Sequence, residues 1–66
     1  MIKVIDKELE LLLDPESKLP YEAEGYRLED GSLVVWDHKS QSWRDAEDQI
    51  YTAVNRDNEL IGFNRI

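Results

Sequence analysis

The sequence predicts a small α+β domain, in which an antiparallel β-meander of about four to five strands in hairpins is joined to one short N-terminal helix. Three observations lead to this fold class. A segment rich in Leu, Glu and Lys ends near Pro15, apolar and polar side chains alternate through residues 21–66, and turn-forming residues separate the alternating stretches. The 66 residues suffice for a single domain, residues 1–66, and no more.

The N-terminal part of the chain predicts a strand followed by the helix. Residues 2–5 contain three β-branched residues and predict a short strand. Asp6 fits an N-cap position, and residues 7–13 consist of Lys, Glu and Leu, which favour helix until Pro15 ends it. Residues 8–11 also alternate in the manner of a strand, which is a second interpretation of this segment. The composition and the proline favour the helix.

The first hairpin is predicted at Asp30 and Gly31, because a two-residue type I′ turn needs residues that tolerate a positive φ. Trp36 would then lie on the face of the sheet that points away from the helix, since side chains alternate along a strand. Counting outward from the turn, the expected pairs are Leu28 with Leu33, Arg27 with Val34, Tyr26 with Val35 and Gly25 with Trp36.

The second turn is predicted at residues 38–41, as a four-residue loop. It places Trp36 opposite Trp43, and Asp37 opposite Ser42. Cross-strand aromatic pairs stabilise a sheet by up to about 1 kcal/mol relative to alanine. The tryptophan pair therefore supports this register.

The third hairpin is predicted within residues 49–66. Asp57 and Asn58 form its turn, because both residue types tolerate left-handed backbone. The expected pairs are Val54 with Ile61 and Thr52 with Phe63.

A second helix at about 43–55 is an alternative to the start of this hairpin. Residues 42–45 resemble a helix-capping box, and Trp43, Ala46 and Ile50 are spaced like one helical face. Residues 50–54 are dominated by β-forming residues, which favours the hairpin.

The charge of the chain restricts its partners. Fifteen acidic and eight basic residues give a net charge of −7. Direct binding to nucleic acid is disfavoured, because neutralising phosphates requires a basic surface. Anionic membrane surfaces are disfavoured for the same reason. The acidity serves either solubility or docking on a basic partner protein.

The sequence predicts a cytoplasmic protein. There is no cysteine, so no disulfide can form, and this fits a reducing compartment. The longest apolar run is residues 11–13, which is far shorter than a membrane span of roughly 20 residues. Residues 1–6 lack the layout of a signal peptide.

The chain contains no pattern typical of catalysis, metal binding or cofactor binding. Asp45, Glu47 and Asp48 are a dense group of carboxylates, but Arg44 precedes them in a polar stretch that is typical of a solvated turn. His38 is the only histidine, so a His-rich metal site is excluded. A chain of this size is also expected to lack a pocket of about 300 Å³, the lower end of small-molecule sites. We therefore expect no enzymatic activity, no metal and no cofactor.

Protein binding is the function that the sequence predicts best. Trp, Tyr and Arg are frequent anchors of protein interfaces, and an apolar patch with a charged rim is typical of such a surface. The candidate binding residues are Trp36, Trp43, Asp37, Arg44, Asp45, Glu47 and Asp48.

The sequence Tyr-Thr-Ala-Val-Asn-Arg-Asp-Asn-Glu-Leu-Ile-Gly-Phe at residues 51–63 is similar to a hairpin common in acetyltransferases of the GNAT superfamily. The similarity covers about a fifth of the chain. The Arg/Gln-x-x-Gly-x-Gly/Ala stretch, which binds the pyrophosphate of acetyl-CoA in that superfamily, has no counterpart here. The resemblance therefore implies a hairpin and no activity.

The leading hypothesis is a non-enzymatic protein-interaction module. A concrete form is a small acidic inhibitor, of the kind that phages or mobile elements encode, which binds a basic or nucleic-acid-binding protein. The alternative is a homo-oligomeric structural or accessory subunit of a larger complex, with a homodimer formed through the sheet face or through the C-terminal strand, residues 60–66.

Overall fold

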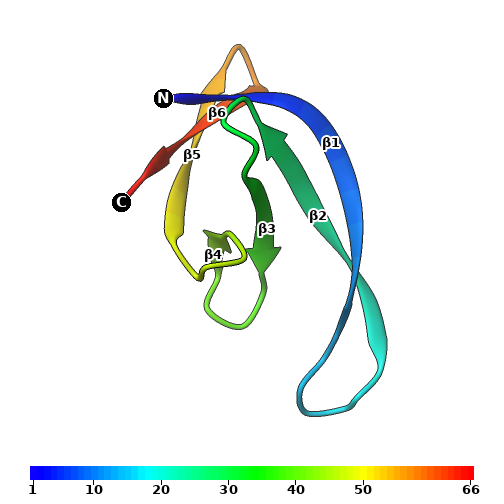
Figure 1. Cartoon of the computed structure of the whole chain (residues 1–66). Helices are drawn as coiled ribbons and strands as arrows, with labels where there is room; N and C mark the ends of the chain where they lie inside the picture. Colours follow the sequence, from blue (N-terminus) through cyan, green and yellow to red (C-terminus); the bar gives the residue numbers. More distant parts are fainter.

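Six antiparallel strands make up the computed structural model, which describes residues 1–66 and contains no helix (Figure 1). Each strand pairs with the next one along the chain, and the last pairs with the first, so the sheet closes into a barrel. The predicted α+β class is therefore wrong, whereas the antiparallel sheet is confirmed. The strands are β1 (Ile2–Leu13), β2 (Pro20–Leu28), β3 (Leu33–Asp37), β4 (Ser42–Arg44), β5 (Ile50–Arg56) and β6 (Glu59–Arg65).

The predicted N-terminal helix is the second half of β1. Residues 7–13 pair with β2 from Lys7 opposite Tyr26 to Leu13 opposite Pro20. Helix propensity is a weak preference that tertiary contacts override, and here the alternation of Glu and Leu matches a strand that has different surroundings on its two faces. Since the structure contains no helix, it has no helical segment that could span a membrane.

The alternative helix at 43–55 is also absent. This region forms β4, a turn and β5. The carboxylate of Asp45 does resemble a cap, but it caps a turn: its Oδ1 accepts hydrogen bonds from the backbone N–H of Glu47 at 2.9 Å and of Gln49 at 3.0 Å. Asp48 has a φ of 66°, which ends any helical path.

The first hairpin turns at Asp30 and Gly31 as predicted, but the predicted two-residue type I′ turn is wrong, because four residues separate β2 from β3 and Asp30 has no positive φ. Its register also differs from the prediction by one residue. Gly31 has a φ of 92°, and the loop extends to Ser32, whose carbonyl accepts a hydrogen bond from the N–H of Leu28 at 2.8 Å. A shift of one residue exchanges the two faces of a strand. Tyr26 therefore shares a face with the buried Val34 and with Trp36, whereas the predicted register placed Tyr26 on the opposite face from both. The observed pairs are Gly25 with Val35, Tyr26 with Val34 and Arg27 with Leu33.

The second hairpin has the predicted register, with Trp36 opposite Trp43 and Asp37 opposite Ser42. The third hairpin turns at Asp57 and Asn58 as predicted, and both residues have a positive φ, of 52° and 66°. A bulge then shifts its register between Val54 and Asn55. The predicted pairs Val54–Ile61 and Thr52–Phe63 are consequently wrong, and the observed pairs are Val54 with Gly62, Ala53 with Phe63 and Tyr51 with Arg65.

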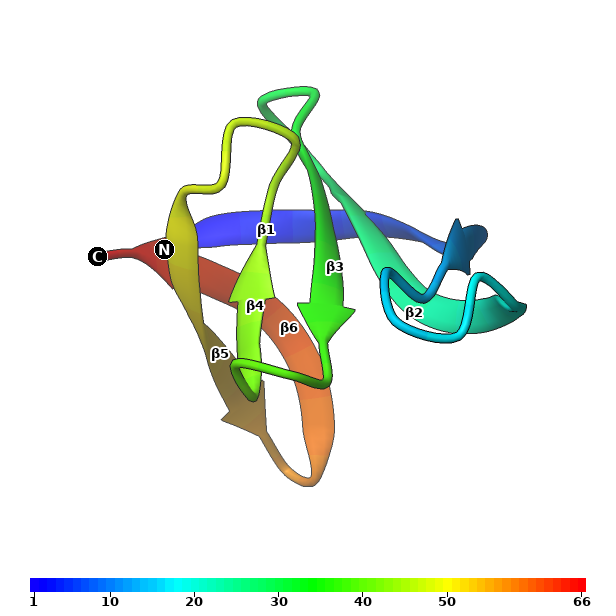
Figure 2. The same ribbon diagram turned by 90° about the horizontal axis from the view of Figure 1, so that it is seen from below.

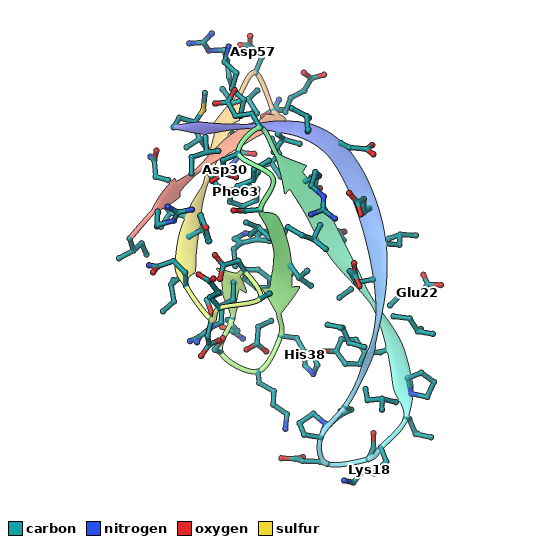
Figure 3. The ribbon with its side chains drawn as sticks, in the orientation of Figure 1. Lys18, Glu22, Asp30, His38, Asp57 and Phe63 are labelled. Atoms are coloured by element: carbon teal, nitrogen blue, oxygen red, sulfur yellow. The ribbon has the colours of Figure 1, made fainter.

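The core of the barrel consists of four buried side chains, Leu28, Val34, Tyr51 and Phe63. Figure 3 shows Phe63 in the interior of the barrel. The barrel closes where Ile2 and Lys3 pair with Phe63 and Gly62. Gly62 is needed at this point, because a Cβ atom there would lie 2.6 Å from the carbonyl oxygen of Ile2.

A long hairpin leaves this barrel. Beyond Lys3, β1 has no partner on the side away from β2, and β3 pairs with β2 only through residues 25–27. Residues 5–24, which we call the ribbon, therefore continue outward as two strands and a turn, as Figure 2 shows. The ribbon accounts for the elongated shape of the molecule, which measures 36 × 22 × 20 Å.

Candidate protein-binding surfaces

One face of the ribbon carries a row of exposed leucines. Leu9, Leu11 and Leu13 are 65%, 70% and 68% exposed. In the pairing with β2 they stand opposite Glu24, Glu22 and Pro20, so a leucine row and a glutamate row run side by side. We call Leu9, Leu11, Leu13, Glu22 and Glu24 the leucine face.

The leucine face is continuous with the inner face of the barrel. Glu24 and Tyr26 lie two residues apart on β2 and therefore share a face. The ring of Tyr26 contacts Trp43 and Phe63, with centroid distances of 5.6 and 6.0 Å, while Lys7 Nζ lies 5.9 Å from its centroid. Beyond this point no strand covers the face. The apolar pattern that fills the barrel therefore continues into solvent along β1.

Most of the charge of the molecule lies on the ribbon. Residues 5–24 contain seven acids and two bases, a net charge of −5 out of −7. On the face opposite the leucines, Glu8 forms an ion pair with Arg27, and the hydrogen bond from the guanidinium, 2.9 Å from Nε to Oε2, lowers the pKa of Glu8. Glu22 and Glu24 form no ion pair, and Figure 3 shows Glu22 pointing away from the barrel.

A hollow of about 570 Å³ borders the glutamate row, between the ribbon and the β3–β4 hairpin. Trp36 and Trp43 contribute aromatic rings to it, and Glu22 and Glu24 lie on its ribbon side. The two tryptophan rings meet edge to face with centroids 5.2 Å apart. Trp36 is 36% exposed, whereas Trp43 also packs against Phe63 at 5.1 Å. Trp43 therefore supports the core, and Trp36 presents the more accessible ring.

Contacts at the far side of this hollow hold the ribbon against the β3–β4 turn. The rings of Tyr21 and His38 meet edge to face at 4.9 Å, and Figure 3 shows His38 pointing toward the ribbon. Lys39 Nζ lies 3.3 Å from Glu16 Oε1. These contacts give the projecting hairpin a defined position, which an isolated two-stranded hairpin would lack.

A second hollow, of about 340 Å³, lies on the other face of the ribbon and contains most of the residues that the sequence singled out. The expectation that a chain of this size has no hollow above about 300 Å³ is therefore wrong. The predicted residues that line it are Trp36, Asp37, Arg44, Asp45 and Asp48. Trp43 lines the first hollow, which we call the tryptophan hollow. Glu47 lines a third depression together with Arg27 and Arg65.

Arg44 is the single base among four carboxylates in the lining of this second hollow, and it forms ion pairs with two of them. Arg44 Nη1 lies 2.9 Å from Asp48 Oδ1, and its Nε lies 4.0 Å from Asp37 Oδ2. A hydrogen bond from the Ser40 hydroxyl is the main cause of a lowered pKa for Asp37. Asp37 thus stays ionised at neutral pH and cannot serve there as a proton donor.

Asp45 holds the β4–β5 turn rather than facing a ligand. Burial raises its pKa, but the hydrogen bonds from the Tyr51 hydroxyl and the N–H of Gln49 outweigh this effect, so the pKa is lowered overall. The Tyr51 hydroxyl donates to Asp45 Oδ2 at 2.8 Å and accepts from Arg65 Nη2 at 2.8 Å. Arg65 continues this chain of contacts to Asp30 at 3.3 Å. The network joins the β4–β5 and β2–β3 turns to strands β5 and β6 of the barrel.

The ribbon leucines were not among the candidate residues drawn from the sequence. The signal that could have found them is the alternation of Glu and Leu in residues 8–13, which as a strand places three leucines on one face. In a helix, Leu9 and Leu13 would share one face while Leu11 would lie on another, so the helical interpretation separates the three leucines. The His, Asp and Glu side chains of the structure form no group of three that could hold a metal ion.

No protein-family model, curated protein or solved structure matches this chain. The surfaces described above are therefore interpreted from their own geometry, exposure and charge.

Proposed function

We propose that this chain is a non-enzymatic protein-interaction module that binds a basic protein in the cytoplasm. The observation that carries this proposal is the leucine face, where three exposed leucines lie beside two carboxylates without ion-pair partners. Burying one leucine side chain stabilises a complex by roughly 1.5–3 kcal/mol, so the face offers a substantial driving force for association.

The charge favours a basic protein over other classes of partner. The ribbon repels phosphate and anionic lipid headgroups, because its net charge is −5. A protein surface with Lys or Arg around an apolar centre would be attracted over long range and would bury the leucines on contact. The second hollow is better suited to binding than to acid–base chemistry, since the pKa values of Asp37 and Asp45 in its lining are both lowered.

A narrower form of the proposal is a small inhibitor. An acidic module that covers the basic surface of a nucleic-acid-binding protein competes with the nucleic acid for that surface. Adding the chain to such a protein, once captured, should release bound DNA or RNA in a filter or mobility assay. Unchanged nucleic-acid binding at saturating chain would contradict the inhibitory form.

Affinity capture with the full chain tests the general proposal. The chain is immobilised, lysate of the native host is passed over it, and bound proteins are eluted by increasing salt and identified by mass spectrometry. We expect basic proteins to elute between about 0.2 and 1 M salt, because contacts among exposed charges are screened in this range. Capture of acidic proteins alone, or binding that ignores salt up to about 1 M, would contradict a partner chosen by charge.

The homo-oligomeric subunit remains as a second candidate, because β1 has a free edge beyond Lys3 that could pair with another copy. The C-terminal strand offers less of an edge, since Gly62 and Phe63 on β6 already pair with β1. Sedimentation velocity over a range of concentrations separates the candidates. A monomer throughout the micromolar range favours the interaction module, and a stable dimer favours the subunit.

A further inference from the structure

Three neighbouring features of the ribbon and barrel mouth form one continuous surface. The leucine row lies on β1, the glutamate row lies beside it on β2, and the tryptophan hollow follows beside β3 and β4. Since paired residues and alternate residues share a face, Leu9, Glu24 and Trp36 follow one another across the same side of the sheet.

We infer that this surface is the docking site for a segment of a basic partner protein that presents a stripe of apolar side chains with a row of Lys or Arg along one side. The apolar stripe covers Leu9, Leu11 and Leu13, and the basic row reaches Glu22 and Glu24. One cationic side chain enters the hollow beside Trp36. This inference rests on the proposed function and assigns its binding surface.

The spacing of the surface fits such a segment. Leucines two residues apart on a strand are separated by about 6.8 Å, and the glutamate row runs about 5 Å from them. Residues three or four apart on a helix lie about 5–6 Å apart, so an amphipathic helix laid along the ribbon can follow both rows. The occupant therefore needs two parallel rows, one apolar and one basic.

The tryptophan hollow fits a cation in particular. An Arg or Lys head group over the face of a tryptophan is attracted by the ring, and the aliphatic stem of the same side chain can lie against Tyr21. Glu24 lines the hollow without an ion-pair partner of its own, so it is free to neutralise the incoming charge.

A second copy of the chain fits this surface poorly. Two ribbons placed face to face would bring together two net charges of −5. The base nearest to the face along β1 is Lys7, whose ammonium group already lies over the ring of Tyr26. Self-association would therefore bury the leucines at the cost of unpaired carboxylates. A basic partner avoids this cost.

Binding of designed peptides to the full chain tests the inference. The probe is a synthetic amphipathic helical peptide with a leucine stripe and a neighbouring row of arginines. One control peptide replaces its leucines by serine, and a second replaces its arginines by glutamate. Affinity is measured by fluorescence anisotropy of the labelled peptide, and the emission of Trp36 and Trp43 reports independently on entry into the hollow.

Two matched pairs of chain variants locate the site. The triple variant Leu9→Ser, Leu11→Ser and Leu13→Ser is compared with Leu19→Ser, because Leu19 is 65% exposed but lies in the ribbon turn outside the leucine face. The double variant Glu22→Gln with Glu24→Gln is compared with Asp57→Asn combined with Glu59→Gln, which changes the net charge equally but at the β5–β6 turn. Near-ultraviolet circular dichroism confirms that each variant retains the barrel.

We expect the leucine–arginine peptide alone to bind, and the triple serine variant to weaken binding at least tenfold, since each lost leucine contact is worth roughly a factor of ten. Leu19→Ser should remain within about twofold, as surface substitutions away from the contact do. The Glu22→Gln and Glu24→Gln variant should weaken binding about three- to tenfold and reduce its salt dependence, whereas its charge-matched control should not.

Three results would overturn the inference. If the peptide binds equally to the triple serine variant, the docking site lies elsewhere and only the general proposal survives. If neither the probe nor a purely basic peptide binds at low salt, the proposed function fails as well. If the unmodified chain sediments as a dimer and the triple serine variant as a monomer, a second copy occupies the surface.

Discussion

The barrel and the ribbon are parts of one sheet, but the apolar side chains of the barrel are buried and those of the leucine face are exposed. In the barrel, Leu28, Val34, Tyr51 and Phe63 are buried against one another. In the ribbon, the same face of the sheet leaves Leu9 and its neighbours in solvent. Closure of the sheet creates a core, whereas the open hairpin has no opposing layer. The difference separates a region built for stability from a region available for contact.

The barrel and the ribbon also differ in net charge. Residues 5–24 carry a net charge of −5, so the rest of the chain carries only −2. In the barrel, acidic side chains take part in hydrogen bonds that hold turns together, as Asp45 does with Tyr51. On the leucine face, the side chains of Glu22 and Glu24 form no ion pair and hold no turn. The acidity of Glu22 and Glu24 is therefore more consistent with recognition than with folding.

The largest effect should come from the barrel core. Phe63→Ala removes a fully buried ring and should cost about 3–5 kcal/mol, which is comparable to the whole stability of a domain of this size. We expect the variant to be largely unfolded. Urea titration followed by tryptophan emission measures this, and a cooperative transition near that of the unmodified chain would contradict the assignment of the core.

Closure of the barrel should be the next most sensitive feature. Gly62→Ala places a Cβ atom 2.6 Å from the backbone oxygen of Ile2, and β1 must move to accommodate it. We expect a loss of about 1–3 kcal/mol in the free energy of unfolding, in line with overpacked sites. Gly31→Ala serves as the comparison, because Gly31 has open space around it and only its φ of 92° opposes the change. Equal stability of Gly62→Ala and the unmodified chain would show that β1 does not close against β6.

Acid should weaken the barrel through carboxylates such as Asp45. The pKa of Asp45 is lowered in the folded chain, so the folded state binds fewer protons than the unfolded state, whose value is about 3.9. The stabilisation is present above that pH and is lost as the pH falls through the folded pKa. In denaturation series from about pH 6 to pH 2, Asp45→Asn should therefore be less stable than the unmodified chain at pH 6 and lose less on acidification. Parallel curves for the two proteins would exclude this role of Asp45.

The smallest effect on stability should come from the leucine face. Leu11→Ser changes a side chain that is 70% exposed, and the free energy of unfolding should change by no more than about 0.5 kcal/mol. The same urea titration measures it. A loss above about 2 kcal/mol would mean that Leu11 supports the fold, and the contrast between barrel and ribbon would not hold.

Local signals in the sequence predicted the local part of this fold. The Asp57–Asn58 turn and the pairing of Trp36 with Trp43 depend on a few neighbouring residues, and both are confirmed. The bulge beside Asn55 and the extra loop residue at Ser32 each shift a register by one. Neither leaves a distinct mark in the sequence, yet each exchanges the inner and outer faces of the strands that follow.

Residues 7–13 of the ribbon carry two opposing signals, a helix-forming composition and a strand-like alternation, and pairing with a distant segment decides between them. Leu, Glu and Lys have high helix propensity, and only the partner β2 makes residues 7–13 a strand. A helix would place Leu11 on a different face from Leu9 and Leu13, and the binding residues predicted from the sequence all lie within residues 36–48. The tryptophan hollow joins that region to the ribbon, so Trp36 and Trp43 lie at the margin of the surface inferred from the structure.

Hydrogen exchange of the full chain with and without the leucine–arginine peptide tests most directly whether the ribbon, rather than the barrel, receives the partner. We expect added protection of backbone amides in residues 5–13 and 20–24, and little change in β5 and β6. Added protection confined to residues 42–48, with the ribbon amides unchanged, would contradict this assignment.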